Sequence, residues 1–277
     1  MGTVSGNPLA CRRGEHRNGG MKTILPGIFL VAAVWVLGVP VVQAEATLLV
    51  DTTFAEDSDG ALPLTISQDN PGDLPLKAPT NAAVSGEGGR LFVQSKGVPG
   101  YEKPVVMFEP GVHPDNPDGV SGIKLIWNLR QIVLEPGGIY ELEFTVIPTA
   151  LPLQGGRIMF SLLTPEGRNV MNTVIHITQL PSLFFNGETF GNYRRRIPVV
   201  TDQVLSVKVR LDLEKNQWAA WVDGQPLVEN ELLPEKLTSE YPQLMLGGFD
   251  FGSEGGLADK PGGTYAIGGV KLSRVTE

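Results

Sequence analysis

The segment VLSVKVRLDL, residues 204–213, alternates apolar and polar side chains along its whole length. Side chains on a β-strand point alternately to its two faces, so this period of two predicts a strand with one buried and one solvated face. Such half-buried strands are typical of antiparallel sheets. The positions expected on the buried face are Leu205, Val207, Val209, Leu211 and Leu213.

The residues that follow predict two more strands. A polar turn at 214–217 is followed by the stretch WAAWVDGQPLV at 218–228. Within it, Asp223-Gly224 is a two-residue hairpin signal, because glycine adopts positive φ without strain and aspartate tolerates it. Residues 204–228 are therefore expected to form a three-stranded meander.

The two tryptophans of this hairpin must lie on opposite faces of their strand, because their positions differ by three, an odd number. One ring therefore enters the core and the other faces outward. The alternation does not decide which ring is buried. We expect Trp218 to lie inside with Ala220 and Val222, and Trp221 to lie on the face open to a ligand.

A second alternating run, IYELEFTVI at 139–147, places Tyr140 and Phe144 opposite Glu141 and Glu143. The 34 glycines and 22 prolines favour frequent turns over long helices. About ten to twelve short strands predict an all-β fold, an antiparallel β-sandwich or jelly roll. Long polar loops are expected at 56–89 and 109–121. The remaining candidate strands lie at 90–94, 105–108, 123–129, 157–163, 173–178, 243–249 and 265–273.

Several short motifs in this order resemble a known superfamily. They are LVDTTF at 49–54, WVDG at 221–224 with Val228, LGG at 246–248 and IGGVKL at 267–272. With them the chain is similar to the concanavalin A-like lectin/glucanase superfamily and, within it, to the laminin-G-like domains of secreted bacterial proteins. The resemblance implies two curved antiparallel sheets. It also implies sugar or protein ligands on the concave face or at the loop rims.

The N-terminal region predicts export. Residues 21–44 carry one lysine, an apolar run and the ending Val-Gln-Ala, which is the layout of a cleaved signal peptide. Residues 1–20 are expected to be an upstream extension with Met21 as the initiator in place of Met1, and residues 45–277 a single β-sandwich domain. The protein would then be secreted or periplasmic, without membrane insertion. The alternative is an uncleaved signal anchor over 24–42.

Charge and cysteine content exclude several functions for residues 45–277. Removing residues 1–44 takes away four of the 22 basic residues and one of the 30 acidic residues, which leaves a net charge of −11. An acidic domain of this kind repels nucleic acid. The single cysteine, Cys11, lies in the predicted extension, so neither a disulfide nor a Cys-His catalytic pair is expected in the domain.

Candidate catalytic residues are few. The Glu-x-Asp-x-x-Glu strand motif of the glucanase branch is absent, and the nearest substitute is Glu141 with Glu143 on one face of a strand. His176 could act as a lyase-type base or hydrogen-bond a sugar. The alternatives are solvated outward glutamates and a structural histidine.

Calcium is a possible cofactor. Acidic turns occur at 56–60, 69–73 and 115–119, and calcium prefers carboxylate and carbonyl oxygens. Asp57 and Asp59 are the candidate ligands. Aspartate-rich and asparagine-rich turns also form without metal, because these side chains hydrogen-bond their own backbone.

The stretch LFFNGETFGNYRRR at 183–196 is the most ligand-like segment of the chain. Aromatic faces stack on sugar C–H groups, and arginine binds carboxylate or sulfate in a bidentate way. Together with Trp221, the residues Tyr193, Arg194 and Arg196 are candidate contacts for a glycan, and the arginines would suit an anionic one. The alternative is a hairpin with a solvated basic tip.

Three hypotheses for function follow. The first is a secreted, non-catalytic module that binds carbohydrate or a surface. The second is a glycoside hydrolase or polysaccharide lyase that uses Glu141, Glu143 or His176. The third is a structural or adhesion module of the cell envelope, which would show a flat apolar patch and no defined pocket.

Overall fold

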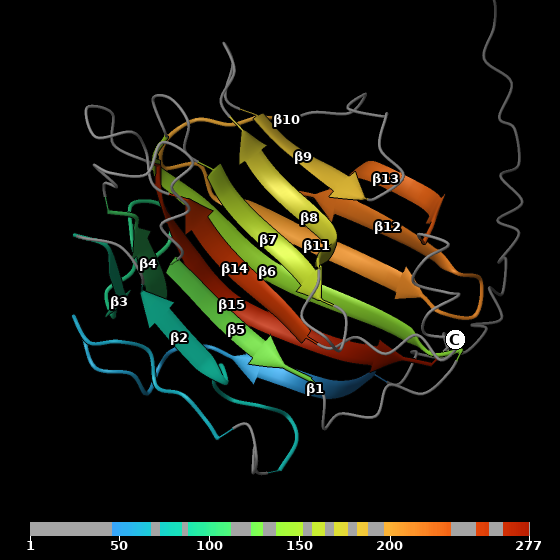
Figure 1. The fold of residues 1–277 in the computed structure, drawn as a ribbon, viewed down its shortest axis with the longest axis horizontal. Coiled ribbons are helices and arrows are strands. Elements are labelled where there is room, and N and C mark those ends of the chain that lie inside the picture. The colour runs from blue at the N-terminus through green and yellow to red at the C-terminus, as the bar shows by residue number, and fades with distance from the viewer. Residues whose placement is uncertain are drawn as a thin grey trace, which may run out of the picture. The chain divides into compact units, whose positions relative to one another are not determined.

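Two antiparallel β-sheets lie face to face in the structure, a computed structural model (Figure 1). No helix occurs in the part of the chain that the structure describes. The described residues are 46–67, 73–84, 88–111, 123–129, 137–151, 157–163, 169–176, 182–187, 197–233, 248–254 and 263–276. The architecture is the predicted all-β antiparallel sandwich.

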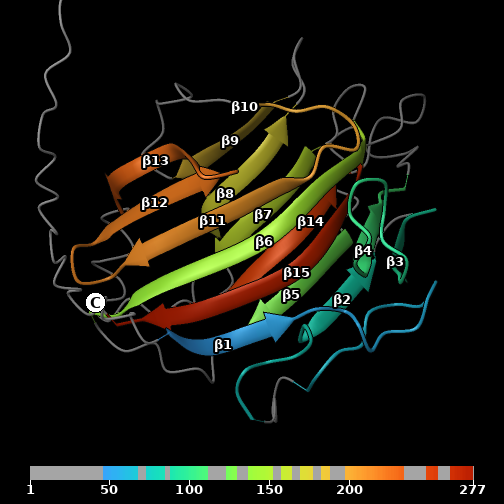
Figure 2. The same cartoon turned by 180° about the vertical axis from the view of Figure 1, so that it is seen from behind.

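The eight-stranded sheet has the order β13-β12-β11-β6-β15-β4-β3, and β1 also pairs with β15. Figure 2 shows this sheet from its outer side, the side turned away from the second sheet. Its strands are β1 (Ala46–Thr52), β3 (Arg90–Gln94), β4 (Val105–Glu109), β6 (Ile139–Ala150), β11 (Leu205–Asp212), β12 (Gln217–Val222), β13 (Gln225–Leu232) and β15 (Thr264–Val275).

The seven-stranded sheet has the order β10-β9-β8-β7-β14-β5-β2 and lies in front of the first sheet in Figure 1. Its strands are β2 (Asn81–Val84), β5 (Ile123–Asn128), β7 (Arg157–Leu163), β8 (Asn169–His176), β9 (Ser182–Gly187), β10 (Ile197–Pro198) and β14 (Gly248–Glu254).

The main core lies between the two sheets and contains the apolar side chains that the alternation placed inward. Aromatic rings fill this space: the Trp127 ring stacks on Phe249, its neighbour within the seven-stranded sheet, with centroids 4.9 Å apart. Phe144 of the eight-stranded sheet meets Phe251 of the seven-stranded sheet edge-on at 4.9 Å and so joins the layers. Burying an aromatic side chain stabilises the fold by about 1.5–3 kcal/mol. The predicted inward residues of β11 are all buried, as are those of β6.

The hairpin between β12 and β13 has the predicted two-residue turn. Asp223 and Gly224 both have positive φ, at 49° and 74°. The Asp223 carboxylate accepts a hydrogen bond from the backbone N–H of Ser206 at 2.8 Å, which fixes the turn against β11. Trp218 is 3% exposed and lies in the core with Ala220 and Val222, whereas Trp221 is half-buried on the opposite face, as expected.

Some strand boundaries differ from the sequence prediction. The predicted strand at 243–249 is β14 at Gly248–Glu254, and residues 243–247 lie outside the described residues. The expected loop at 56–89 contains β2, a short edge strand whose sequence NAAV lacks the alternation that reveals the longer strands. The strand predicted at 173–178 begins earlier, because β8 spans Asn169–His176.

A second, smaller apolar cluster covers one end of the outer face of the eight-stranded sheet. It contains Val98, Val105, Met107, Ile147 and Ala266, with Tyr101 packed against it. This cover explains why four consecutive residues of β4 are buried, since both faces of that strand are protected from solvent. It leaves the β11–β13 end of the same face open.

Residues 43–277 form one compact unit. The predicted extension and signal peptide at 1–44 lie outside the described residues. Among the described residues, no helix has the length and apolar character needed to cross a membrane.

We expect Gly268→Ala to destabilise the fold. A Cβ on Gly268 would lie 2.6 Å from the Tyr101 ring, so the ring must shift off the sheet. Overpacking of this kind costs about 1–3 kcal/mol in the free energy of unfolding. Urea denaturation measures the loss.

The matched control is Gly269→Ala, where the added Cβ would meet only the Tyr101 hydroxyl, at 4.0 Å. We expect this variant to stay within about 0.5 kcal/mol of the parent. Equal stability of the two variants would contradict the packing of Tyr101 on Gly268.

Candidate functional site

A hollow of about 580 Å³ opens on the outer face of the eight-stranded sheet, at the β11–β13 end. Its volume is in the usual range for small-molecule sites. The lining combines the half-buried indole of Trp221 with charged and amide side chains. The lining residues are Arg210, Asp212, Lys215, Gln217, Trp218, Ala219, Trp221, Glu229 and Asn230.

The lining of the hollow includes a small residue, Ala219, that lies opposite an irregular part of β13. Ala219 offers only a methyl group between the larger side chains of Gln217 and Trp221 on the same face of β12. Opposite it, β13 contains a β-bulge: Val228 pairs with Ala220 and Glu231 with Trp218, so two residues of β13 face the single residue Ala219.

The two bulge residues are Glu229 and Asn230, and both line the hollow. Asn230 has a φ of 51°, a left-handed conformation that asparagine tolerates better than most residues. Bulges re-aim side chains next to functional sites. The bulge therefore accounts for two polar side chains at a place where a regular strand would present one.

Trp221 lies at one side of the hollow. In the strand register it is flanked by Lys208 on β11 and Pro226 on β13. The ring is half-buried, so its position is held by neighbours while part of it faces solvent. An aromatic ring held in this way can stack on an apolar ligand surface.

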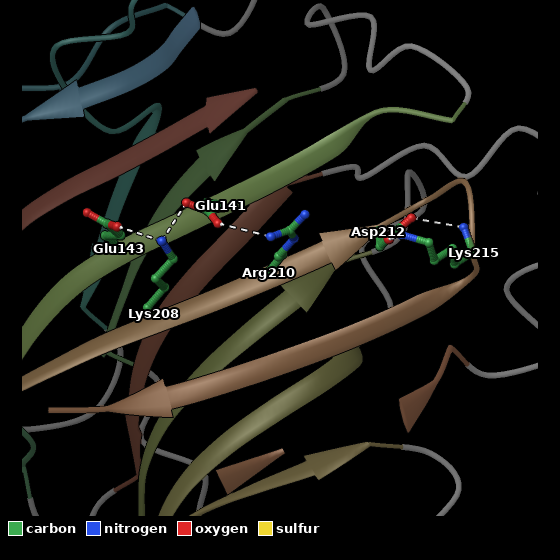
Figure 3. A network of polar contacts seen from close by, with 6 residues as sticks. All are labelled: Glu141, Glu143, Lys208, Arg210, Asp212 and Lys215. Carbon is green, nitrogen blue, oxygen red and sulfur yellow. Dashed lines mark hydrogen bonds and ion pairs between the residues drawn. The ribbon is translucent and has the colours of Figure 1, made fainter. Parts of the chain in front are cut away.

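Asp212 and Lys215 form a fixed ion pair in the wall of the hollow (Figure 3). The Asp212 carboxylate accepts hydrogen bonds from the backbone N–H of Lys215 at 2.9 Å and from its Nζ at 3.0 Å. Burial, the largest single influence, raises the pKa of Asp212, but the hydrogen bonds from Lys215 and the charges of Lys215 and Arg210 outweigh it. The net pKa is lowered, so Asp212 stays ionised.

A charge ladder continues along the same face, formed by Glu143, Lys208, Glu141 and Arg210 (Figure 3). The ammonium group of Lys208 lies 2.5 Å from Glu141 and 3.3 Å from Glu143, and Arg210 lies 3.9 Å from Glu141. Burial, the largest influence, lowers the pKa of Lys208, but its contacts with both glutamates outweigh this and the net pKa is raised. Lys208 therefore stays charged.

The candidate catalytic residues are not brought together. Glu141 and Glu143 lie on β6 of the eight-stranded sheet, are engaged with Lys208 and do not line the hollow. His176 is the last residue of β8 in the seven-stranded sheet, where its backbone pairs with Arg157 and Ser182. Because the two glutamates lie on one sheet and the histidine on the other, they would have to act in separate sites.

The predicted ligand segment is only partly described. Ser182–Gly187 forms β9, and Leu183 is buried in the core. Tyr193, Arg194 and Arg196 lie outside the described residues, so their role as glycan contacts stays a prediction.

The candidate calcium ligands act as turn acceptors. The backbone N–H of Leu64 donates to Asp57 Oδ1 at 2.5 Å, and Ser95 donates to Asp59 Oδ1 from its N–H at 2.7 Å and its hydroxyl at 2.9 Å. In the described ranges no group of three or more His, Cys, Asp or Glu side chains could hold a metal ion. Calcium at Asp57 and Asp59 stays a prediction that these contacts do not support.

Asp250 is an unforeseen buried carboxyl group. It lies on β14 between the core residues Phe249 and Phe251, and only 6% of it is exposed. Burial raises its pKa, and this effect is partly offset by the charge of Lys124 and a hydrogen bond with Ser161. The alternation along β14 indicates that the Asp250 side chain points away from the core. It does not indicate that this side chain is buried.

Comparisons with known proteins add little beyond the architecture. No protein-family model and no curated protein matches the sequence. Among solved structures, the alginate lyase AlgAT5 of polysaccharide lyase family 7 is similar at 11% identity and a TM-score of 0.45, over 70% of this chain and 85% of that chain. The resemblance to laminin-G-like domains therefore stays a prediction.

Two further solved structures show the same level of likeness. The CBM2 module of the evolved Dit protein of Lactobacillus casei BL23 phage J-1 has 10% identity and a TM-score of 0.49, over 85% of this chain and 99% of that module. A sialidase has 10% identity and a TM-score of 0.43 over 70% of this chain, which spans only 17% of the sialidase. At these values none of the likenesses carries an argument about function.

The two buried aspartates should give opposite pH dependences. Because the folded-state pKa of Asp212 is lowered, its contribution to stability is present above the unfolded pKa of about 3.9 and is lost as the pH falls through the folded value. Asp212→Asn should therefore be less stable than the parent at neutral pH, with a difference that shrinks in acid. Urea denaturation from about pH 3 to pH 7 measures it.

Asp250→Asn is the matched variant, for which we expect the opposite dependence of relative stability on pH. Its raised folded pKa means that the stabilising contribution is present at low pH and is lost as the pH rises through the folded value. The stability of Asp250→Asn relative to the parent should therefore increase from acid to neutral pH. If the relative stability of both variants changed with pH in the same direction, the lowered pKa of Asp212 and the raised pKa of Asp250 would be contradicted.

Proposed function

We propose that the chain is an exported, non-catalytic carbohydrate-binding module and that the hollow beside Trp221 is its glycan site. The observation that carries the proposal is the half-buried indole of Trp221 at the side of a hollow that is otherwise lined mostly by hydrogen-bonding side chains. A sugar ring presents apolar C–H faces and a rim of hydroxyl groups, so it matches an aromatic face next to polar groups.

The polar lining suits hydroxyl groups. Gln217 and Asn230 each carry an amide that both donates and accepts hydrogen bonds, and Glu229 accepts them. The Asp212 carboxylate accepts two hydrogen bonds from Lys215 and is only 11% exposed, so it is ordered before a ligand arrives. A site that is ordered in advance loses less entropy on binding.

The ion pairs favour binding over catalysis. A general acid in a glycosidase needs a raised pKa, whereas the pKa of Asp212 is lowered. Glu141 and Glu143 are both engaged with Lys208 outside the hollow. Asp250 has the raised pKa that a general acid needs, but it does not line the hollow. A defined hollow does not fit the adhesion hypothesis of a flat apolar patch.

The prediction is that Trp221→Ala loses binding to soluble polysaccharides. Removing a stacked ring should weaken the affinity by about tenfold or more, which corresponds to about 1.4 kcal/mol. Affinity gel electrophoresis with a panel of polysaccharides measures the retardation of the parent and of the variant.

The control is Leu62→Ala, at a residue that is 56% exposed and lies outside the hollow. It should be retarded like the parent, and circular dichroism should show that both variants are folded. Full retardation of a folded Trp221→Ala protein would remove the hollow from the binding site.

A further inference from the structure

The charges around the hollow indicate which class of sugar it binds. This inference rests on the proposed function. We propose that the hollow recognises an uncharged, hydroxyl-rich sugar, because each basic side chain in and beside it already has a carboxylate partner. This goes beyond carbohydrate binding as such and is opposite to the anionic glycan that the arginines at 194–196 suggest.

The two basic residues of the hollow are both engaged. Lys215 donates to Asp212 at 3.0 Å, and Arg210 lies 3.9 Å from Glu141. The carboxylates of these pairs are shielded from solvent, with the Asp212 and Glu141 side chains only 11% and 16% exposed, whereas Lys215 and Arg210 are 56% and 30% exposed. Partly buried pairs are screened less by salt than exposed ones. A ligand carboxylate would have to share these cations with carboxylates that repel it.

The next basic residue along the face is engaged as well. Lys208, beside Trp221 in the register, lies between Glu141 and Glu143 at 2.5 Å and 3.3 Å. A sugar that extends from Trp221 along the sheet would therefore meet charged side chains that are already paired with one another. Hydroxyl groups can hydrogen-bond to such a ladder without charge repulsion, whereas a sulfate or carboxylate is repelled by its two glutamates.

The remaining charge near the hollow is acidic. Glu229 also lines it, so two acidic and two basic side chains contribute to its walls. The whole chain has a formal net charge of −8 at pH 7. A polyanion is repelled by a protein of this charge unless a basic patch attracts it. The described hollow contains no such patch.

The test compares polymers that share a backbone and differ in charge. Suitable pairs are hydroxyethylcellulose with carboxymethylcellulose, dextran with dextran sulfate, and highly esterified with de-esterified pectin. Affinity electrophoresis of the whole protein against each pair, with Trp221→Ala and Leu62→Ala beside it, identifies binding through the hollow.

The expected result is Trp221-dependent retardation by an uncharged member of a pair. Its affinity should change by less than about twofold between about 50 mM and 500 mM salt, because no charge on the ligand is screened. Binding should also stay constant between about pH 5 and pH 8, where carboxylates and lysines at ordinary pKa values keep their charge.

Three results would overturn the inference in different ways. Trp221-dependent retardation by charged polymers alone, lost by tenfold or more at about 500 mM salt, would leave the glycan site standing and refute its selectivity. Charged-polymer binding that Trp221→Ala leaves intact would assign the partner to another region, such as the arginines at 194–196. Retardation by no polymer would refute the proposed function itself.

Discussion

Packing between the inward faces of the two sheets is the interaction on which the rest of the structure depends. No cysteine is available after residue 11, so no disulfide can replace this core. The stacked rings of Trp127 and Phe249 and the edge contact of Phe144 with Phe251 fill the space between the layers. Because this core is rigid and densely packed, side chains on the outer faces have fixed positions.

The outer face of the eight-stranded sheet is divided into two halves by what covers it. Tyr101 and the small apolar cluster protect the β4 end, and Gly268 makes room for the ring. The β11–β13 end carries the charge ladder and the hollow. The proposed glycan site therefore lies on strands rather than on loops, which favours a preformed geometry.

Much of the fold could be predicted from the sequence, because alternation is a local signal. It gave the inward residues of β6 and β11, the turn at Asp223-Gly224 and the opposite directions of Trp218 and Trp221. Short strands without alternation, such as β2, could not be found in this way. The boundaries of β8 and β14 depend on partner strands, which the local sequence does not reveal.

The candidate site was less predictable, because it depends on contacts between strands. Trp221 was expected on the open face, but Gln217, Glu229 and Asn230 were not singled out. Their convergence on Ala219 requires the register of β12 with β13 and the bulge within it. Glu141 and Glu143 were correctly placed on one face, yet their engagement with Lys208 follows from the register of β6 with β11, which sequence alone does not give.

The irregularity of β13 has a consequence for the solution behaviour of the protein. This strand ends its sheet, and a regular end strand with free backbone donors invites pairing with another molecule. Pro226 lacks a donor, the bulge at Glu229 and Asn230 interrupts the row of amides, and the glutamates repel a second acidic copy. The deformation that shapes the hollow therefore also protects this border of the sheet against aggregation.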